Sequence, residues 1–186
     1  MVDIGVIVGR FQVFHKGHLE YAIEAKKRCK YLVVGVTNYD ESTFSYEGTA
    51  PHRNQKIANP LNYYERYKMI EAILSKEPSL RYNYMIVPFP LHQPRLIREY
   101  VPQDAVVYMT LFDQWSIEKR KKIESANYKV EVLWSDMENE RLITASKIRK
   151  SISCGEEWQQ YVPIEGVEYM LQANIVEKIK SNGNYN

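Results

Sequence analysis

The chain has 186 residues, of which 45% are hydrophobic and 26% are charged. These proportions are typical of a folded globular protein and exclude a disordered or collagen-like chain. At roughly 150 residues per domain, the length predicts a single domain over residues 1–186. The 25 lysines and arginines nearly balance the 23 aspartates and glutamates, so bulk charge does not indicate a nucleic-acid partner.

The two cysteines, Cys29 and Cys154, cannot form a disulfide framework and are not spaced with histidines as zinc ligands. We expect reduced thiols, as is usual in a cytoplasmic protein. No apolar run approaches the roughly 18 residues that span a bilayer, and residues 1–8 lack the basic segment of a signal peptide. The sequence therefore predicts a soluble, cytoplasmic protein with no membrane partner.

The first predicted elements form a β-α-β unit. Residues 4–8 (IGVIV) and 31–36 (YLVVGV) are short apolar runs rich in β-branched residues, which is typical of buried strands. Between them, apolar residues of the segment 17–29 recur at i, i+3 and i+4, the spacing of one helical face. Two buried strands joined by one helix predict a parallel sheet.

The alternation of strands and helices continues along the chain. A capping box (NYYE) begins a helix at Asn62, and Pro94 suits the first turn of another. Strands are predicted over residues 84–87, 105–109 and 130–134, and helices over 62–75, 94–100, 116–126, 144–153 and 164–179. This pattern is typical of an α/β protein with a doubly wound parallel sheet and a helical C-terminal end, here from about residue 144.

Residues 37–60 interrupt this alternation because they show no periodicity and are long for a loop. The segment is polar and contains Arg53 and Lys56. It is interpreted either as a solvated insertion or as a lid or substrate loop.

The most informative stretch is residues 9–18 (GRFQVFHKGH), which directly follow the first strand. In an open α/β sheet, ligands bind beyond the carboxyl ends of the strands, and the N-terminus of the next helix favours phosphate. Gly9 lets the backbone approach closely, and two histidines three residues apart project to one side of the first helical turn. The side chains expected to face a polyphosphate are Arg10, His15, Lys16 and His18.

The chemistry expected at this loop is stabilisation of phosphate charge. The sequence presents no serine or cysteine as a nucleophile, and it contains no P-loop motif. Positioned cationic and hydrogen-bonding groups can accelerate phosphoryl-type transfer without a covalent intermediate.

Residues 9–18 resemble the GRFQPFHxGH signature of the nucleotidylyltransferase superfamily, with Val13 where proline is usual. Residues 143–149 (ITASKIR) resemble its second signature, an ISSTxIR-like segment that begins a late helix. Residues 59–66 (NPLNYYER) look like the NPFxxxER segment of archaeal-type nicotinamide mononucleotide (NMN) adenylyltransferases, and residues 155–163 (GEEWQQYVP) are similar to the GxxW…VP stretch of that group. The resemblance covers most of the chain and implies a Rossmann-like nucleotidyltransferase fold.

This resemblance implies transfer of a nucleoside monophosphate from a nucleoside triphosphate (NTP), with ATP as the first expectation, to a small phosphate-bearing acceptor such as NMN. Pyrophosphate is released. His15 and His18 would stabilise the transition state, and Arg149 would bind the β- and γ-phosphates. Mg²⁺ would accompany the triphosphate and hold few protein ligands. The residues implied to bind the nucleotide are Gly9, Arg10, Phe11, Gln12, Val13, Thr144 and Ser146. Family members are often oligomers, so a homo-oligomer is a further expectation.

The acceptor side departs from the NMN-specific pattern. Residues 88–95 (PFPLHQPR) contain no tryptophan, residues 110–115 (TLFDQW) replace an SGNP-like turn, and the loop 37–60 is longer than usual. Because these segments follow three predicted strands, we expect them to surround one edge of the sheet and to govern acceptor choice. The candidate acceptor-binding residues are Arg53, Lys56 and Arg95, which would bind a phosphate, and Trp115, which would stack. A merely solvated position is the alternative for each basic residue.

Four functions are compatible with these residues. The first is a nucleotidyltransferase that uses ATP and NMN or a related acceptor. The second is a cytidylyltransferase on the same fold that activates a small phosphate or phosphonate with CTP. A non-catalytic nucleotide-binding regulatory module is disfavoured because His15, His18 and Arg149 are all present. An RNA-binding domain is disfavoured because the 15 tyrosines are scattered along the chain, as packing residues are.

Overall fold

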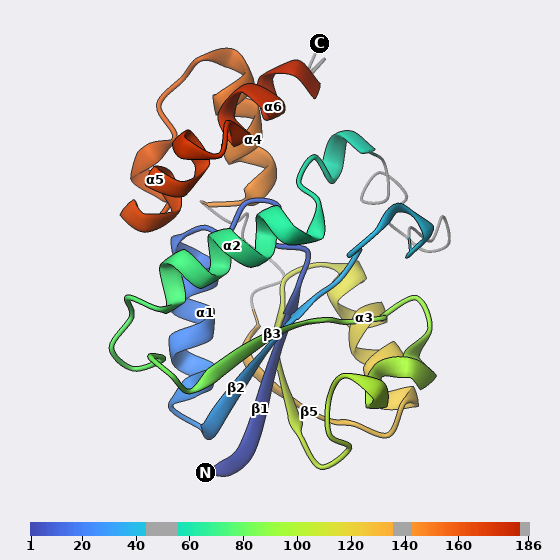
Figure 1. The fold of residues 1–186 in the computed structure, drawn as a ribbon. Helices are drawn as coiled ribbons and strands as arrows, with labels where there is room; N and C mark the ends of the chain where they lie inside the picture. The colour runs from blue at the N-terminus through green and yellow to red at the C-terminus, as the bar shows by residue number, and fades with distance from the viewer. Residues whose placement is uncertain (44–55, 136–142, 183–186) are drawn as a thin grey trace.

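The computed structural model describes residues 1–43, 56–135 and 143–182. Within these residues, the centre is a five-stranded parallel sheet with the strand order β3-β2-β1-β4-β5 (Figure 1). The strands are β1 (Val2–Gly9), β2 (Cys29–Val36), β3 (Tyr84–Pro88), β4 (Val106–Leu111) and β5 (Lys129–Ser135). Since β1 pairs with β2 on one side and with β4 on the other, the strand order reverses at β1. Ligands of open parallel sheets bind at such a switch point, beyond the carboxyl ends of the strands.

Helices cover both faces of the sheet (Figure 1). The helices α1 (Lys16–Lys26) and α2 (Tyr63–Leu74) lie against one face, and α3 (Gln114–Ser125) and the 3-10 helix η4 (Pro94–Glu99) lie against the other. After β5 come α4 (Ala145–Cys154), α5 (Ile164–Gln172) and α6 (Ile175–Asn182), in which α5 packs on α2 and α6 on α4. Short 3-10 turns are η1 (Glu41–Thr43), η3 (Lys56–Ala58) and η5 (Gln159–Tyr161). The predicted doubly wound α/β fold with a helical C-terminal end is confirmed.

The central strand contributes to both cores. Ile7 packs with α1, α2 and the C-terminal helices, whereas Val6 and Val8 pack with α3 and η4, and all three are at most 2% exposed. Successive side chains of a strand point to opposite faces, so a strand covered on both sides needs apolar residues at consecutive positions. This requirement explains the unbroken apolar run in β1. The packing on both faces fixes the end of the strand beneath the following loop.

Two predicted helices differ in detail. The segment predicted over residues 94–100 is the 3-10 helix η4, because so short a segment gains little from the costly nucleation of an α-helix. The helix predicted over 164–179 is divided into α5 and α6, and Asn174 lies between them with a φ of +54°. Asparagine adopts this left-handed conformation more readily than most residues. In the described part of the chain, no helix combines the length and apolar character needed to cross a membrane.

Candidate active site

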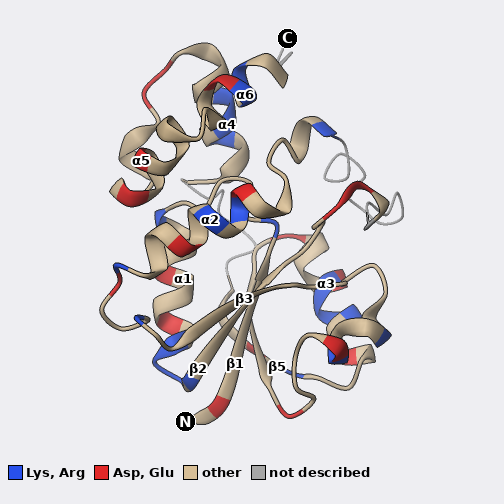
Figure 2. Cartoon of the chain, viewed as in Figure 1, with Lys and Arg blue, Asp and Glu red and all other residues tan. Residues whose placement is uncertain are grey.

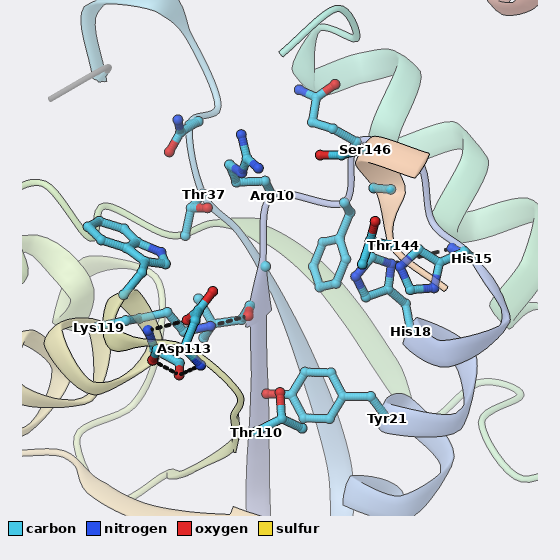
Figure 3. Close-up of a pocket in the computed structure, with 18 of the residues that line it drawn as sticks. Arg10, His15, His18, Tyr21, Thr37, Thr110, Asp113, Lys119, Thr144 and Ser146 are labelled. Atoms are coloured by element: carbon cyan, nitrogen blue, oxygen red, sulfur yellow. Dashed lines mark hydrogen bonds between the residues drawn. The ribbon is translucent and has the colours of Figure 1, made fainter. Parts of the chain in front are cut away.

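A pocket of about 270 Å³ lies at the carboxyl edge of the sheet (Figure 3). Its lining comes from the loop after β1, the start of α1, the loops after β2 and β3, the turn between β4 and α3, and the first turn of α4. These segments are far apart in the sequence and meet only because the parallel strands bring their carboxyl ends together. The pocket therefore occupies the place that the sheet topology predicts for a ligand.

The loop after β1 turns sharply at Phe11, which has a φ of +51° and is 2% exposed. Its ring folds back over Gly9, where a Cβ atom would lie 2.7 Å from the nearest ring carbon. A side chain at position 9 would therefore displace Phe11. The glycine makes room for the aromatic ring, and the ring in turn packs against His18 of the next helix.

His18 is held among aromatic rings. Its imidazole stacks on that of His15 with a centroid distance of 3.7 Å, and it contacts Phe11 edge-on at 5.0 Å and Phe14 at 5.4 Å. The backbone N–H of His15 donates a hydrogen bond to Nδ1 of His18 at 3.3 Å. Because Nδ1 accepts this bond, a neutral His18 carries its proton on Nε2. The structure thus brings the two predicted histidines together at the pocket (Figure 3).

Gln12 fixes the loop to the start of α2. Its buried carboxamide donates to the carbonyl of Leu61 at 2.8 Å and accepts from the N–H of Leu61 at 2.9 Å. Both ends of the side chain are thus used by the protein, although the residue still lines the pocket. Val13 is fully buried in the hydrophobic core, and it does not belong to the residues that line the pocket.

Arg149 joins the second predicted motif to the first. Its side chain is buried, and its guanidinium donates to the carbonyl of Gln12 and, at 3.3 Å, to Oγ of Ser146. Thr144 caps α4 by accepting a hydrogen bond from the N–H of Lys147 at 3.2 Å. Thr144 and Ser146 therefore line the pocket from the N-terminal turn of α4, with Arg149 behind them.

Arg66 is a site residue to which the sequence assigned no role. It is fully buried in α2, and it donates to the carbonyls of Arg10 at 2.8 Å, Thr37 at 2.7 Å and Asn38 at 2.7 Å. Burial lowers its pKa to about 10, so the side chain stays charged at neutral pH. Arg66 thereby ties together the loops after β1 and β2, both of which line the pocket. It belongs to the NPLNYYER segment, and that resemblance was the only sequence signal for it.

A second wall of the pocket follows β4. Trp115, which the sequence predicted, lines it together with Thr110 and Asp113 of the predicted acceptor-side segment 110–115. Lys119, which the sequence did not single out, lines it as well. Asp113 caps α3 by accepting a hydrogen bond from the N–H of Ser116 at 2.7 Å. Lys119 donates to the carbonyl of Val8 at 2.6 Å. The sequence signal for Thr110 and Asp113 was their position just after a predicted strand, whereas Lys119 lies within a predicted helix and had no such signal.

Several predicted basic residues do not line the pocket. Lys56 is exposed and forms an ion pair with Glu41 at 3.2 Å, and Arg95 is exposed on η4. Lys16 is likewise exposed at the start of α1. Arg53 lies outside the described residues. Of the candidate acceptor-binding residues that the structure describes, only Trp115 reaches the pocket.

The fold and the position of the pocket define the general class, an α/β protein with its ligand site at the switch point of a parallel sheet. The chain belongs to the cytidylyltransferase-like family, whose model matches residues 6–151. That range contains every residue that lines the pocket. The family confirms the prediction that the chain is a nucleotidyltransferase.

The curated relatives carry two kinds of activity in their names. A phosphonoformate cytidylyltransferase from Streptomyces viridochromogenes is 36% identical over 95% of this chain and 95% of that relative. A nicotinamide-nucleotide adenylyltransferase from Thermoplasma acidophilum is 28% identical over 94% of this chain and 88% of that relative. Both relatives thus align along nearly their whole length.

A solved structure confirms the Rossmann-like nucleotidyltransferase fold. It is a bifunctional NMN adenylyltransferase/ADP ribose pyrophosphatase from Francisella tularensis, complexed with AMP and a manganese ion. The match has a TM-score of 0.67 at 19% identity and covers all of this chain. The chain spans 54% of the length of that bifunctional protein, so the likeness concerns the fold alone.

Proposed function

We propose that this protein transfers a nucleotidyl group from an NTP to a small acceptor that carries a phosphonate or phosphate group. The observation that supports the proposal best is the meeting of two distant segments on one side of the pocket (Figure 3). His15 and His18 come from the start of α1, and Ser146 comes from the start of α4. A triphosphate placed between them would lie near two helix N-termini, whose N–H groups and dipoles favour phosphate.

In the proposed reaction, an acceptor oxygen attacks the α-phosphorus, and the bond from that phosphorus to pyrophosphate breaks. Negative charge develops on the non-bridging oxygens of the α-phosphate. His18 would donate to these oxygens through Nε2–H, since its Nδ1 already accepts a hydrogen bond from the backbone of His15. His15, stacked on His18, would contact an adjacent phosphate oxygen. Fixed donors of this kind stabilise the transition state without having to reorganise.

The leaving pyrophosphate would be held from α4. Ser146 and the first backbone N–H groups of this helix would bind its oxygens directly. Arg149 donates to Ser146 and to the carbonyl of Gln12, so it would orient Ser146 and add positive charge behind it. In this proposal, Arg149 favours binding of the β- and γ-phosphates through its positive charge and through its hydrogen bond to Ser146.

Magnesium would enter with the triphosphate. In the described residues, no group of three or more histidine, cysteine, aspartate or glutamate side chains could hold a metal ion. Asp113 supplies a carboxylate to the pocket lining. This donor set fits Mg²⁺, which keeps water ligands and prefers the oxygens of substrate phosphates. Bound there, the ion would neutralise phosphate charge.

Of the two substrate pairs expected from the sequence, we propose CTP with a small phosphonate acceptor. The support is the 36% identity to the phosphonoformate cytidylyltransferase along 95% of both chains. The absence of tryptophan from residues 88–95, where NMN-specific enzymes are expected to have one, supports the same choice. A second candidate is adenylyl transfer from ATP to NMN, supported by relatives of that name at 24–28% identity.

The test is a matrix of pyrophosphate-release assays. Each of the four NTPs is combined with Mg²⁺ and with phosphonoformate, methylphosphonate, sugar phosphates, nicotinate mononucleotide or NMN. We expect the highest kcat/KM with CTP and a phosphonate. A maximum with ATP and NMN would replace the first candidate with the second, and pyrophosphate release with no pair would contradict both.

A further inference from the structure

The pocket has two walls of different chemistry. Figure 3 places His15, His18 and Ser146 on one side of the end of β1, and Asp113 and Lys119 on the other. In the proposed reaction, the first wall binds the triphosphate. The acceptor must approach the α-phosphorus from the remaining space, so its far end would meet the second wall.

Lys119 gives this second wall a fixed positive charge. Its ammonium nitrogen lies 2.6 Å from the carbonyl of Val8, the residue before the last one of β1. The side chain is half-buried, so its charge is less screened than that of an exposed lysine. An ammonium has three N–H donors, so one that donates to a carbonyl can also donate to an anion.

Its place in the pocket lining distinguishes Lys119 from the other basic residues of α3. Residues 119–122 (KRKK) form a basic run on this helix (Figure 2). Arg120 pairs with Glu124 at 2.7 Å, and Lys122 lies 5.7 Å from the ring centroid of Trp115. Within this run, Lys119 is the residue that lines the pocket.

The carboxylate of Asp113 lies on the same wall and must be considered with the lysine. It accepts the hydrogen bond of Ser116 that caps α3, and the N-terminal dipole of the helix offsets part of its charge. The ammonium of Lys119 donates to the carbonyl of Val8 near the end of β1. A second anionic group on the acceptor would therefore be attracted to Lys119.

We propose that Lys119 binds a second anionic group of the acceptor, such as a carboxylate next to the reacting phosphonate. This proposal rests on the proposed function and adds the residue that selects the acceptor class. The same charge disfavours NMN, because the nicotinamide ring of NMN is a cation and would meet a like charge at this wall. Lys119 thus contributes both attraction to one acceptor and repulsion of another.

The test compares matched acceptors in Lys119→Met. Phosphonoformate carries a phosphonate and a carboxylate, whereas methylphosphonate lacks the second anion. Because hydrogen bonds from charged groups are stronger than neutral ones, we expect the preference for phosphonoformate, as a ratio of kcat/KM values, to fall about 10- to 100-fold. The fall should come mainly from KM. Lys121→Met, which removes a charge from an exposed position of the same helix outside the pocket lining, is the control and should keep the wild-type ratio.

An unchanged ratio in Lys119→Met would overturn the assignment of Lys119 while leaving the cytidylyl transfer intact. A wild-type enzyme that prefers NMN to phosphonates would overturn it as well. If the wild type is inactive with phosphonates, calorimetric titration with phosphonoformate alone tests whether Lys119 binds this acceptor. Binding that is lost in Lys119→Met and kept in Lys121→Met supports the site, and equal or absent binding in wild type and Lys119→Met overturns it.

Discussion

The imidazole of His18 is fixed by ring packing and by a hydrogen bond to its Nδ1 atom. Phe11, Phe14 and His15 pack around the ring, and the backbone of His15 bonds to Nδ1. A hydrogen-bond donor oriented in this way before substrate binds loses little entropy when the transition state forms. The rings of Phe11 and Phe14 are therefore part of the site even though they carry no charge.

We expect His18→Ala to lower kcat by about 10²- to 10³-fold, as removal of one preorganised donor typically does. Steady-state pyrophosphate release measures the effect, and circular dichroism checks the fold. Lys16→Ala is the matched control, because Lys16 is an exposed residue of the same helix turn, and it should retain near wild-type kcat. Full activity in a folded His18→Ala protein would contradict the assigned role.

We expect Arg149→Ala to raise the KM for the NTP by about 10- to 100-fold, since hydrogen bonds from charged groups contribute roughly 1.5–3 kcal/mol. The KM for the acceptor should change less. Arg149→Lys should recover only part of the affinity, because an ammonium cannot contact Gln12 and Ser146 with a planar fork. Lys150→Ala, an exposed neighbour on α4, serves as the control. An equal increase in the KM values for the NTP and for the acceptor would indicate that Arg149 has a purely structural role.

At the scale of elements, α2 supports the pocket without lining it. Arg66 binds backbone carbonyls of the two loops that follow β1 and β2, and Gln12 binds Leu61, two residues before α2. The capping box of Asn62 and Glu65 fixes where the helix starts. The start of α2 therefore sets the positions of both loops.

We expect Arg66→Met to reduce the free energy of unfolding by about 3 kcal/mol or more, because each buried carbonyl left without a donor costs roughly 1–3 kcal/mol. Urea denaturation measures this change. Since both loops would loosen, the KM values for NTP and acceptor should rise together. Arg98→Met, a surface substitution on η4 whose ion pair is exposed, should change stability by less than about 0.5 kcal/mol. A stable Arg66→Met protein would contradict this account.

The sequence predicted the strands and most helices because their signals are local. Apolar runs, a capping box and the 9–18 and 143–149 motifs can each be recognised within a few neighbouring residues. The roles of Arg66 and Lys119 could not be found in this way, since their partners are backbone carbonyls far away in the chain, such as Val8 for Lys119. Backbone carbonyls occur at every residue and leave no sequence signal. The break at Asn174 was missed because apolar residues continue the helical period on both sides of it.

At the scale of the whole molecule, the pocket joins the sheet to the C-terminal helices. The motif on α4 contacts the loop after β1 through Arg149 and Gln12, and α6 contacts α2 through Lys178 and Glu65, whose atoms lie 2.7 Å apart. A ligand that contacts both the α1 side and α4 would therefore hold together two parts of the chain that are more than a hundred residues apart. Ligand binding should consequently stabilise the whole fold.

We expect an NTP with Mg²⁺ to raise the melting temperature in the absence of acceptor. A ligand at 100 times its Kd contributes about 2.7 kcal/mol, and for a chain of this size each kcal/mol raises Tm by about 2–4 °C, which gives a shift of about 5–11 °C. At equal saturating concentrations, CTP should give a larger shift than ATP, since a tenfold difference in Kd corresponds to about 1.4 kcal/mol. Inorganic pyrophosphate alone should give a smaller shift, because it fills only the part of the pocket near α4. Differential scanning fluorimetry measures all three, and a larger shift with ATP would contradict the proposed base preference. No shift with any nucleotide would contradict nucleotide binding in this pocket.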